Sequence, residues 1–189
     1  LEMGKPENML DKIIEGKKPG SFELKNSSAK ISTEVNEVET KSWNVGGFIE
    51  GSDPELKNEW IIIGAHFDHL GMGGEGSLYR GNEPQIHNGA DDNASGTTGV
   101  LELAEKFASQ KDKLKRSIAF FTFSGEELGL LGSNYLVNNM PFPAEDAITM
   151  INMDMIGKLK DSSLIVYGTG TSSNWEDILN KYNNYGFKL

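Results

Sequence analysis

Four short apolar runs, separated by polar segments, give the middle and the end of the chain a strand-like pattern. They cover residues 60–65, 117–123, 148–153 and 164–167. Continuous apolar runs of this length are typical of strands that are buried between layers of helices. Residues 94–110 and 173–182 predict helices, because their apolar side chains recur at helical spacing. Strands that alternate with helices predict an α/β fold, a three-layer α/β/α sandwich around a mixed, mostly parallel sheet.

The first part of the chain has a more polar pattern. Residues 9–14 predict a short helix, residues 31–36 alternate as a half-buried strand does, and residues 45–49 form a second strand-like run. We expect these strands to form an antiparallel edge with one face in water. The sequence therefore divides into residues 1–40, a linking or edge segment, and residues 41–189, the domain that carries the candidate chemistry.

The composition narrows the classes of function. Among 189 residues, 28 Asp and Glu outnumber 18 Lys and Arg, which gives a formal net charge of −10. This surplus argues against a nucleic-acid-binding surface and against a polybasic membrane surface, and the apolar runs are too short to span a bilayer. The sequence has no cysteine. A metal ion would therefore be held by histidine, carboxylate or carbonyl groups.

Histidine and carboxylate side chains gather where the predicted strands end. They are His66 and Asp68 after the first apolar run, Glu126 and Glu127 after the second, Asp154 after the third, and Asp91 just before the long helix. The carboxyl edge of an open α/β sheet is where ligands bind. Carboxylates crowded at one rim repel each other unless a cation lies among them. Histidine with carboxylates and no thiol suits zinc in a catalytic site.

Each of these motifs also has a purely structural interpretation. His66 is then a satisfied core histidine at the end of a strand. Glu126 and Glu127 complement the positive end of a helix dipole, and Asp91 with Asp92 caps the helix that follows. The occurrence of all the motifs in one chain favours the metal site over these separate explanations.

The motifs as a set resemble those of the M28 family of co-catalytic zinc metallopeptidases. They are A-H-F-D-H at 65–69, N-G-A-D-D-N-A-S-G at 88–96, S-G-E-E-L-G-L-L-G-S at 124–133 and N-M-D-M-I-G at 152–157. The resemblance implies that two zinc ions bind in a complete site. Its residue roles are His66 and Asp154 as ligands of one zinc, Glu127 as a ligand of the other, Asp91 as the bridge, Glu126 as general base and acid, and Asp68 as the residue that orients His66. It also implies a cis peptide bond between Asp91 and Asp92.

The family uses a fifth ligand, a histidine near the end of the domain. The three histidines of this sequence are His66, His69 and His87, and none follows Asp154. We therefore expect a fragment that ends before the last strand and the last ligand, with one zinc position lacking a histidine. The family motifs make neither His69 nor His87 a ligand, so both are expected to have loop or supporting roles.

The resemblance implies a zinc-dependent exopeptidase, most simply an aminopeptidase that acts on peptides with a free N-terminus. In that mechanism Glu126 takes a proton from the attacking water and passes it to the leaving amine. Two alternatives stay open: a single-zinc enzyme similar to glutaminyl cyclase, and a non-catalytic interaction module with the same fold. By the resemblance alone, we expect an extracytoplasmic location, periplasmic or secreted.

Overall fold

The computed structural model describes residues 28, 30–36, 39–74, 76–81 and 83–189. The chain divides into two units, Leu1–Glu39 and Thr40–Leu189. The helix predicted at 9–14 lies outside the described residues. The strand predicted at 31–36 is wrong, because these residues form neither helix nor strand. Ile31 and Val35 are almost fully exposed, so alternation alone does not make a strand where its apolar face has nothing to pack against.

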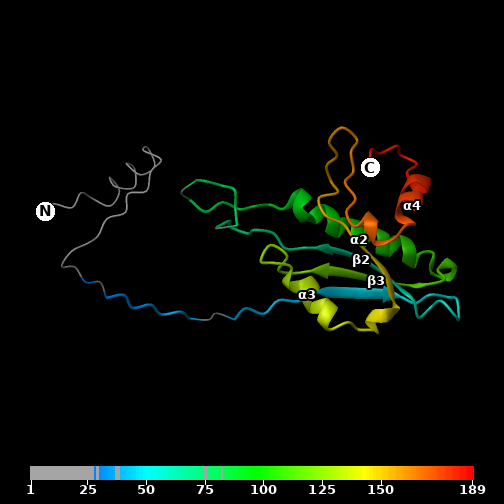
Figure 1. Ribbon diagram of the computed structural model, residues 1–189, viewed down its shortest axis with the longest axis horizontal. Helices are drawn as coiled ribbons and strands as arrows, with labels where there is room; N and C mark the ends of the chain where they lie inside the picture. The colour runs from blue at the N-terminus through cyan, green and yellow to red at the C-terminus, as the bar shows by residue number, and fades with distance from the viewer. Residues whose placement is uncertain (1–27, 29, 37–38, 75, 82) are drawn as a thin grey trace. The chain divides into compact units, whose positions relative to one another are not determined.

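The second unit is built on a mixed sheet of four strands (Figure 1). The strands are β1 (Val45–Ile49), β2 (Trp60–His66), β3 (Ser117–Phe123) and β4 (Ala147–Asn152), and their order across the sheet is β1-β3-β2-β4. β2 is parallel to both of its neighbours, whereas β1 pairs antiparallel with β3. The sheet confirms the predicted α/β class, the parallel centre and the antiparallel edge at 45–49.

The helix predicted at 94–110 is α2 (Gly96–Ala108), and it packs on one face of the sheet (Figure 1). Val100 of α2 is buried against two residues of each central strand, which are Ile63 and Ala65 of β2 and Ile118 and Phe120 of β3. Burying such side chains supplies about 1.5–3 kcal/mol each for the larger ones. This cluster fixes β2, β3 and α2 as one packed body, from whose ends the candidate site residues extend.

The other two α-helices of the described residues are shorter. They are α3 (Leu131–Asn138), which follows the turn after β3, and α4 (Trp175–Tyr182), which agrees with the helix predicted at 173–182. Among the helices of the described residues, none combines the length and the apolar character that crossing a membrane requires.

Two expectations about the apolar runs are wrong. β4 lies at the edge of the sheet and its apolar side chains are largely exposed, whereas the sequence predicted burial on both faces. Residues 164–167 form no strand, and Ile165 and Tyr167 are 71% and 88% exposed. An apolar run pairs and becomes buried only where neighbouring elements cover it, and within residues 83–189 nothing covers these two segments fully.

The carboxyl ends of the parallel strands are held level with one another. His66 at the end of β2 pairs in register with Phe123 at the end of β3, and Phe67 N–H donates to the Phe123 carbonyl at 2.9 Å. On the other side of β2, Met153 N–H donates to the Gly64 carbonyl at 2.9 Å. The segments that leave the three strands therefore start side by side at one rim.

At the opposite end of β3, Ser117 ties the segment between β1 and β2 to the sheet. The side chain is fully buried, and its hydroxyl accepts from Gly51 N–H at 3.0 Å and donates to the Lys57 carbonyl. Gly51 leaves no room for a side chain, since a Cβ would lie 2.3 Å from the Lys115 carbonyl oxygen. The hydroxyl of Ser117 thus satisfies two main-chain groups that have little access to water.

Replacing Ser117 with alanine should lower the free energy of unfolding by about 1–3 kcal/mol, because two backbone groups lose their partner in a buried place. Urea unfolding followed by circular dichroism measures the change. Ser109→Ala is the matched control, since Ser109 is exposed at the end of α2 and its hydroxyl bonds only within its own turn. Equal effects of the two substitutions would contradict the role given to Ser117.

Candidate metal centre

His66 is the most deeply buried of the candidate metal ligands, at 3% exposed. Its Nδ1 lies 3.1 Å from the carbonyl oxygen of Asp68. A carbonyl can only accept, so Nδ1 carries the proton of the neutral ring and Nε2 carries the lone pair. Among the described residues, Nε2 is the one buried side-chain polar atom without a hydrogen-bond partner. An unsatisfied buried nitrogen is costly, which makes this atom a candidate ligand.

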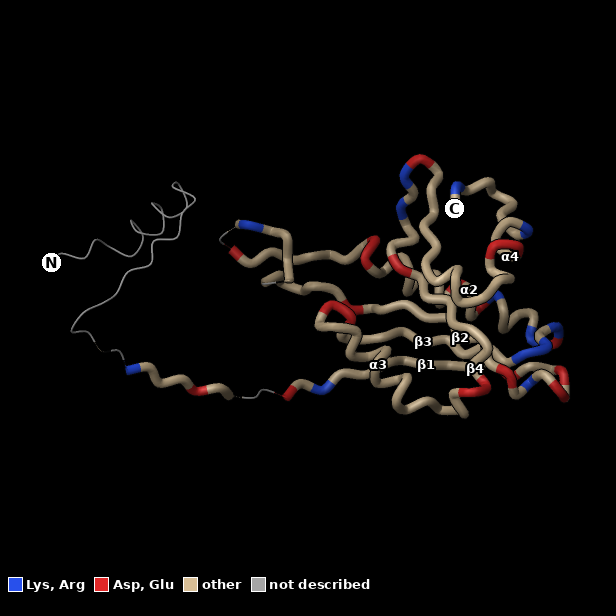
Figure 2. Tube along the Cα trace, in the orientation of Figure 1, with Lys and Arg blue, Asp and Glu red and all other residues tan. Residues whose placement is uncertain are grey.

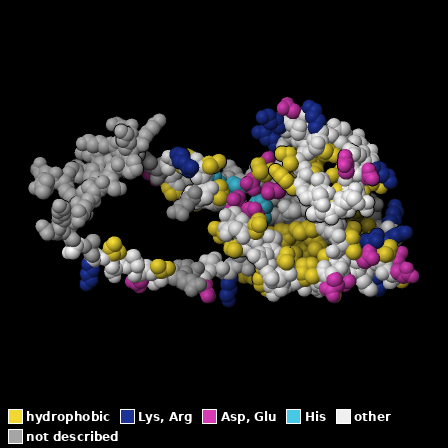
Figure 3. Space-filling model, viewed as in Figure 1, with side chains coloured by type: hydrophobic (Ala, Val, Ile, Leu, Met, Phe, Trp, Pro, Cys, Tyr) yellow, Lys and Arg dark blue, Asp and Glu magenta, His cyan; other side chains and the backbone are white. Residues whose placement is uncertain are grey.

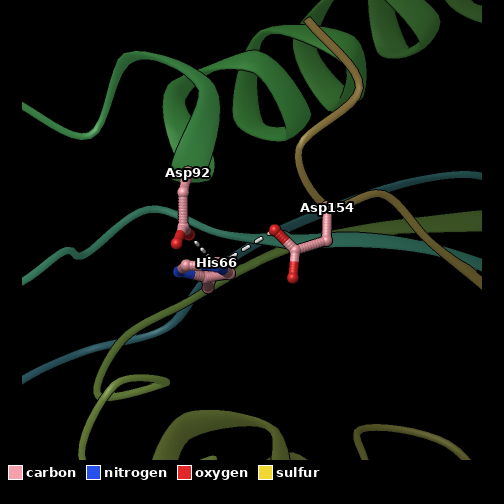
Figure 4. Close-up of side chains that lie close together, drawn as sticks. All are labelled: His66, Asp92 and Asp154. Atoms are coloured by element: carbon pink, nitrogen blue, oxygen red, sulfur yellow. Dashed lines mark ion pairs between the residues drawn. The ribbon is translucent and has the colours of Figure 1, made fainter. Parts of the chain in front are cut away.

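Two carboxylates face this nitrogen (Figure 4). The Oδ1 of Asp92 lies 3.2 Å from Nε2 and the Oδ1 of Asp154 lies 3.5 Å from it. Two ligand atoms bound to one tetrahedral zinc are about 3.4 Å apart, given bonds of about 2.1 Å. The three atoms are therefore spaced as ligands of one cation. The donor set fits zinc.

Asp92 also belongs to a second group. Its other oxygen, Oδ2, lies 3.9 Å from Nδ1 of His69, and that Nδ1 lies 2.6 Å from Oε1 of Glu127. His69, Asp92 and Glu127 form this second group of possible ligands, and all three are half-buried. Asp92 thus presents one oxygen to each group, which is the arrangement that a bridging carboxylate requires.

The structure places Asp91, the predicted bridge, away from the possible ligands. Asp91 lies outside both groups: its Oδ1 accepts from Gly157 N–H at 2.9 Å, and its carbonyl accepts from the Ser95 hydroxyl. The cis peptide bond is also one residue later than expected, between Asp92 and Asn93. Within residues 90–95, the backbone angles of Asp92 and Asn93 are not helical. That backbone path turns Asp92 toward His66 and leaves Asp91 beside the loop after β4.

Asn93, which the sequence analysis did not single out, joins two segments of the site. Its side chain is 1% exposed. Its Nδ2 donates to the Met153 carbonyl at 3.0 Å, and its Oδ1 accepts from the N–H groups of Gly96 and Met155 at 3.0 and 3.2 Å. These bonds hold the loop that carries Asp154 against the turn that carries Asp92. The sequence contained a signal for this role: residue 93 is an asparagine beside two aspartates, and an amide can donate and accept hydrogen bonds at once, which an ionised carboxylate cannot.

Asp68 contacts His66 in a different way from the one expected. The ring Nδ1 is closer to the carbonyl oxygen of Asp68, at 3.1 Å, than to its carboxylate Oδ1, at 3.7 Å. The same Oδ1 accepts from Glu126 N–H at 3.2 Å. The main chain of Asp68 thus orients the ring, while its carboxylate links the segment after β2 to the turn after β3.

The turn that carries Glu126 and Glu127 is fixed by Asn44, the residue before β1. Asn44 accepts from Ser124 N–H at 3.2 Å and donates to the Gly132 carbonyl at 2.7 Å. A Cβ on Gly132 would lie 2.3 Å from the Asn44 amide oxygen, so this close approach requires glycine. Glu126 and Glu127 lie before α3 and not in its first turn. The interpretation that they complement a helix dipole therefore does not apply to α3.

Glu126 differs from Glu127 in lying outside both ligand groups. Burial raises the pKa of the Glu126 carboxyl above its ordinary value; nearby His66 lowers this pKa, and the charges of Glu127, Asp154 and Asp92 raise it. Acidic positions lie on separate segments near the carboxyl ends of β2 and β3 (Figure 2), and their side chains surround histidines on the surface (Figure 3). A carboxyl with a raised pKa beside a metal-binding group suits proton transfer.

The chain is similar to known peptidases over most of its length. A sequence model of peptidase family M28 matches residues 44–187. The leucine aminopeptidase 2 of Trichophyton rubrum is 29% identical over 153 residues, which are 78% of this chain and 27% of that protein. The probable zinc metalloprotease of Pyrenophora tritici-repentis is 37% identical over 113 residues, which are 59% of this chain and 24% of that protein. The chain thus spans about a quarter of the length of the curated relatives it matches.

Substitutions at Asp91 and Asp92 test which of these two carboxylates bridges the two ligand groups. Asp92→Asn should weaken zinc binding by at least about tenfold, because it removes a charged ligand from both groups. Asp91→Asn should change zinc affinity by less than about threefold, since an amide oxygen can still accept from Gly157 N–H. Calorimetric zinc titration of both variants measures the difference. The larger loss in Asp91→Asn would restore the assignment made from the sequence.

Proposed function

The chain belongs to peptidase family M28, and we propose that it carries the zinc-binding catalytic centre of an aminopeptidase, which hydrolyses the first peptide bond of a substrate with a free N-terminus. The observation that carries the proposal is the buried, unpartnered Nε2 of His66 between the carboxylates of Asp92 and Asp154. The relatives support both parts: one is named a zinc metalloprotease and others leucine aminopeptidases.

In this proposal His66, Asp92 and Asp154 hold one zinc ion. Bound zinc would polarise the scissile carbonyl and lower the pKa of the attacking water. The protein's part is to keep three donor atoms at ligand spacing before the metal arrives. The main chain of Asp68 holds the ring of His66, and Asn93 holds the segments of Asp92 and Asp154 together. Positioning of this kind lowers the cost of assembling the site.

Glu126 is the general base and then the general acid. Its carboxylate takes a proton from the attacking water and passes the proton to the nitrogen of the leaving amine. The base must be ionised at the start, and a raised pKa brings its proton affinity closer to that of both partners. Asp68 contributes by accepting from Glu126 N–H, which fixes the backbone from which the carboxylate extends.

The two alternatives predict different surroundings for Asp92. A single-zinc enzyme similar to glutaminyl cyclase needs one ligand group, whereas Asp92 faces two. A non-catalytic module needs neither the ligand spacing around His66 nor a half-buried carboxyl beside it that belongs to neither group. The shared carboxylate and the raised pKa of Glu126 therefore favour a peptidase with two metal positions.

The proposed role of Glu126 predicts that Glu126→Gln lowers kcat for leucine p-nitroanilide by about 10²–10⁴-fold, because glutamine cannot carry the proton. Zinc affinity should stay within about threefold of the wild type, since Glu126 belongs to neither ligand group. Steady-state kinetics on zinc-loaded protein and calorimetric titration measure the two quantities.

Glu105→Gln is the matched control for this experiment, because Glu105 is exposed on α2. It removes one negative charge far from the rim and should leave kcat unchanged. Unchanged kcat in Glu126→Gln would exclude Glu126 as the base. Loss of zinc affinity together with kcat would make Glu126 a ligand instead.

A further inference from the structure

We propose that His69 is a positioning residue of the candidate centre: its ring N–H holds one oxygen of the Glu127 carboxylate, and this orients the other oxygen for a zinc ion. The inference rests on the proposed function, since it takes Glu127 as a zinc ligand. It goes beyond the resemblance, which leaves His69 with an unspecified loop or supporting role.

The first support is the direction of the hydrogen bond between the two side chains. Nδ1 of His69 lies 2.6 Å from Oε1 of Glu127. An ionised carboxylate can only accept, so Nδ1 carries a proton and donates it to this bond. Nδ1 is placed to be a ligand of the second group, but a protonated ring nitrogen has no lone pair for a metal ion. Through Nδ1, His69 can therefore act on a metal only by way of the carboxylate.

The second support is the way in which the two oxygens of Glu127 differ. Oε1 accepts from His69, whereas Oε2 takes part in no hydrogen bond among the described residues. The side chains of both residues are about four-fifths buried, which limits the competition of water for this bond. Hydrogen bonds from neighbouring groups are the usual means by which proteins orient a ligating carboxylate. Glu127 is thus held at one oxygen and open at the other.

The third support is that Asp68 and His69 hold both of the adjacent glutamates. Oδ1 of Asp68 accepts from Glu126 N–H at 3.2 Å, and His69 donates to the side chain of Glu127. The first contact fixes the backbone of the turn after β3, and the second fixes a carboxylate that this turn carries. Because His66 lies in the same segment as Asp68 and His69, the two contacts set the position of Glu127 relative to His66.

The fourth support is that the ring of His69 is itself held in place. A Cβ on Gly89 would lie 2.9 Å from the Cβ of His69, so the backbone before the Asp92 turn packs closely against this histidine. The ring also lies edge-on to His87, with ring centroids 6.2 Å apart, and Nε2 of His87 hydrogen-bonds the Ser77 hydroxyl at 2.9 Å. A donor that is fixed by its neighbours can impose an orientation on its partner.

A purely structural tie is the simpler explanation of the same hydrogen bond. In that case His69 joins the segment after β2 to the turn after β3 and stabilises the fold, and nothing more. Loss of the bond would then lower the free energy of unfolding but leave the zinc affinity of the folded chain unchanged. The positioning role predicts that the zinc affinity falls as well.

Calorimetric zinc titration of the chain separates these explanations. His69→Leu removes the donor and should weaken, by about 10–100-fold, the zinc binding that Glu127→Gln also weakens. His69→Asn is the matched variant, because its Nδ2 takes the place of Nδ1 and still donates. Its zinc affinity should stay within about threefold of the wild type. Urea unfolding of each metal-free variant shows that it is folded and measures its stability.

Two results of this titration would overturn the proposal. An unchanged zinc affinity in His69→Leu, whatever its stability, would leave only the structural tie. Equal losses of affinity in His69→Leu and His69→Asn would show that the imidazole is needed for something other than its donated N–H, such as direct coordination.

Long-range 15N–1H spectra of the imidazole rings test the donor role without a substitution. The proton on Nδ1 of His69 should be present in the metal-free chain and should remain when zinc is added. If this proton is absent, or if zinc displaces it and moves Nδ1 to the range of a metal-bound nitrogen, the proposal is overturned.

Failure of the proposed function gives a different result. If the wild type binds no zinc, or if His66→Gln and Glu127→Gln both leave zinc binding unchanged, the candidate centre is wrong and the inference fails with it. If these two substitutions weaken zinc binding while His69→Leu does not, the proposed function stands and the inference about His69 alone is refuted.

Discussion

The site depends on one electrostatic constraint: a buried imidazole lone pair faces two carboxylates at ligand distance. Nε2 of His66 has no hydrogen-bond partner, and Asp92 and Asp154 lie 3.2 and 3.5 Å away. The buried nitrogen lacks a hydrogen bond, and two carboxylates close together repel each other, so the arrangement costs free energy unless a positive charge lies among these groups. Folding must supply that free energy elsewhere. The packed cluster of β2, β3 and α2 is where the structure buries most of its apolar side chains.

The packed cluster holds the strands in place, and the rest of the second unit holds the segments at the rim relative to the strands. Parallel pairing keeps the ends of β2, β3 and β4 level, so that their following segments emerge together. Asn93 then joins the segment after β4 to the turn before α2, and Asn44 fixes the turn after β3. The ligands come from segments far apart in the sequence, and the side-chain amides of buried Asn93 and half-buried Asn44 connect these segments. A preformed site therefore needs these amides as much as its ligands.

The sequence predicted the parts of the fold that single segments encode. The apolar runs at 60–65 and 117–123 are strands. His66 and Asp154 face each other because His66 ends one strand of the parallel pair and Asp154 closely follows the other. The choice between Asp91 and Asp92 was not predictable from spacing, since neighbouring carboxylates differ only through the backbone path of the turn. The strand predicted at 164–167 is wrong for a related reason: strand pairing depends on neighbouring elements, which a local sequence pattern does not contain.

The contact between His69 and Glu127 explains why two adjacent glutamates can have different tasks. Glu127 is engaged by the imidazole at 2.6 Å, whereas Glu126 makes no such contact and has a raised pKa. The negative charge on Glu127 is among the causes of that raised pKa. A cation beside Glu127 would offset its charge, so the proton affinity of Glu126 depends on how the neighbouring groups are filled. The second group is therefore connected to the proposed base through Glu127, which His69 contacts and which directly follows Glu126 in the chain.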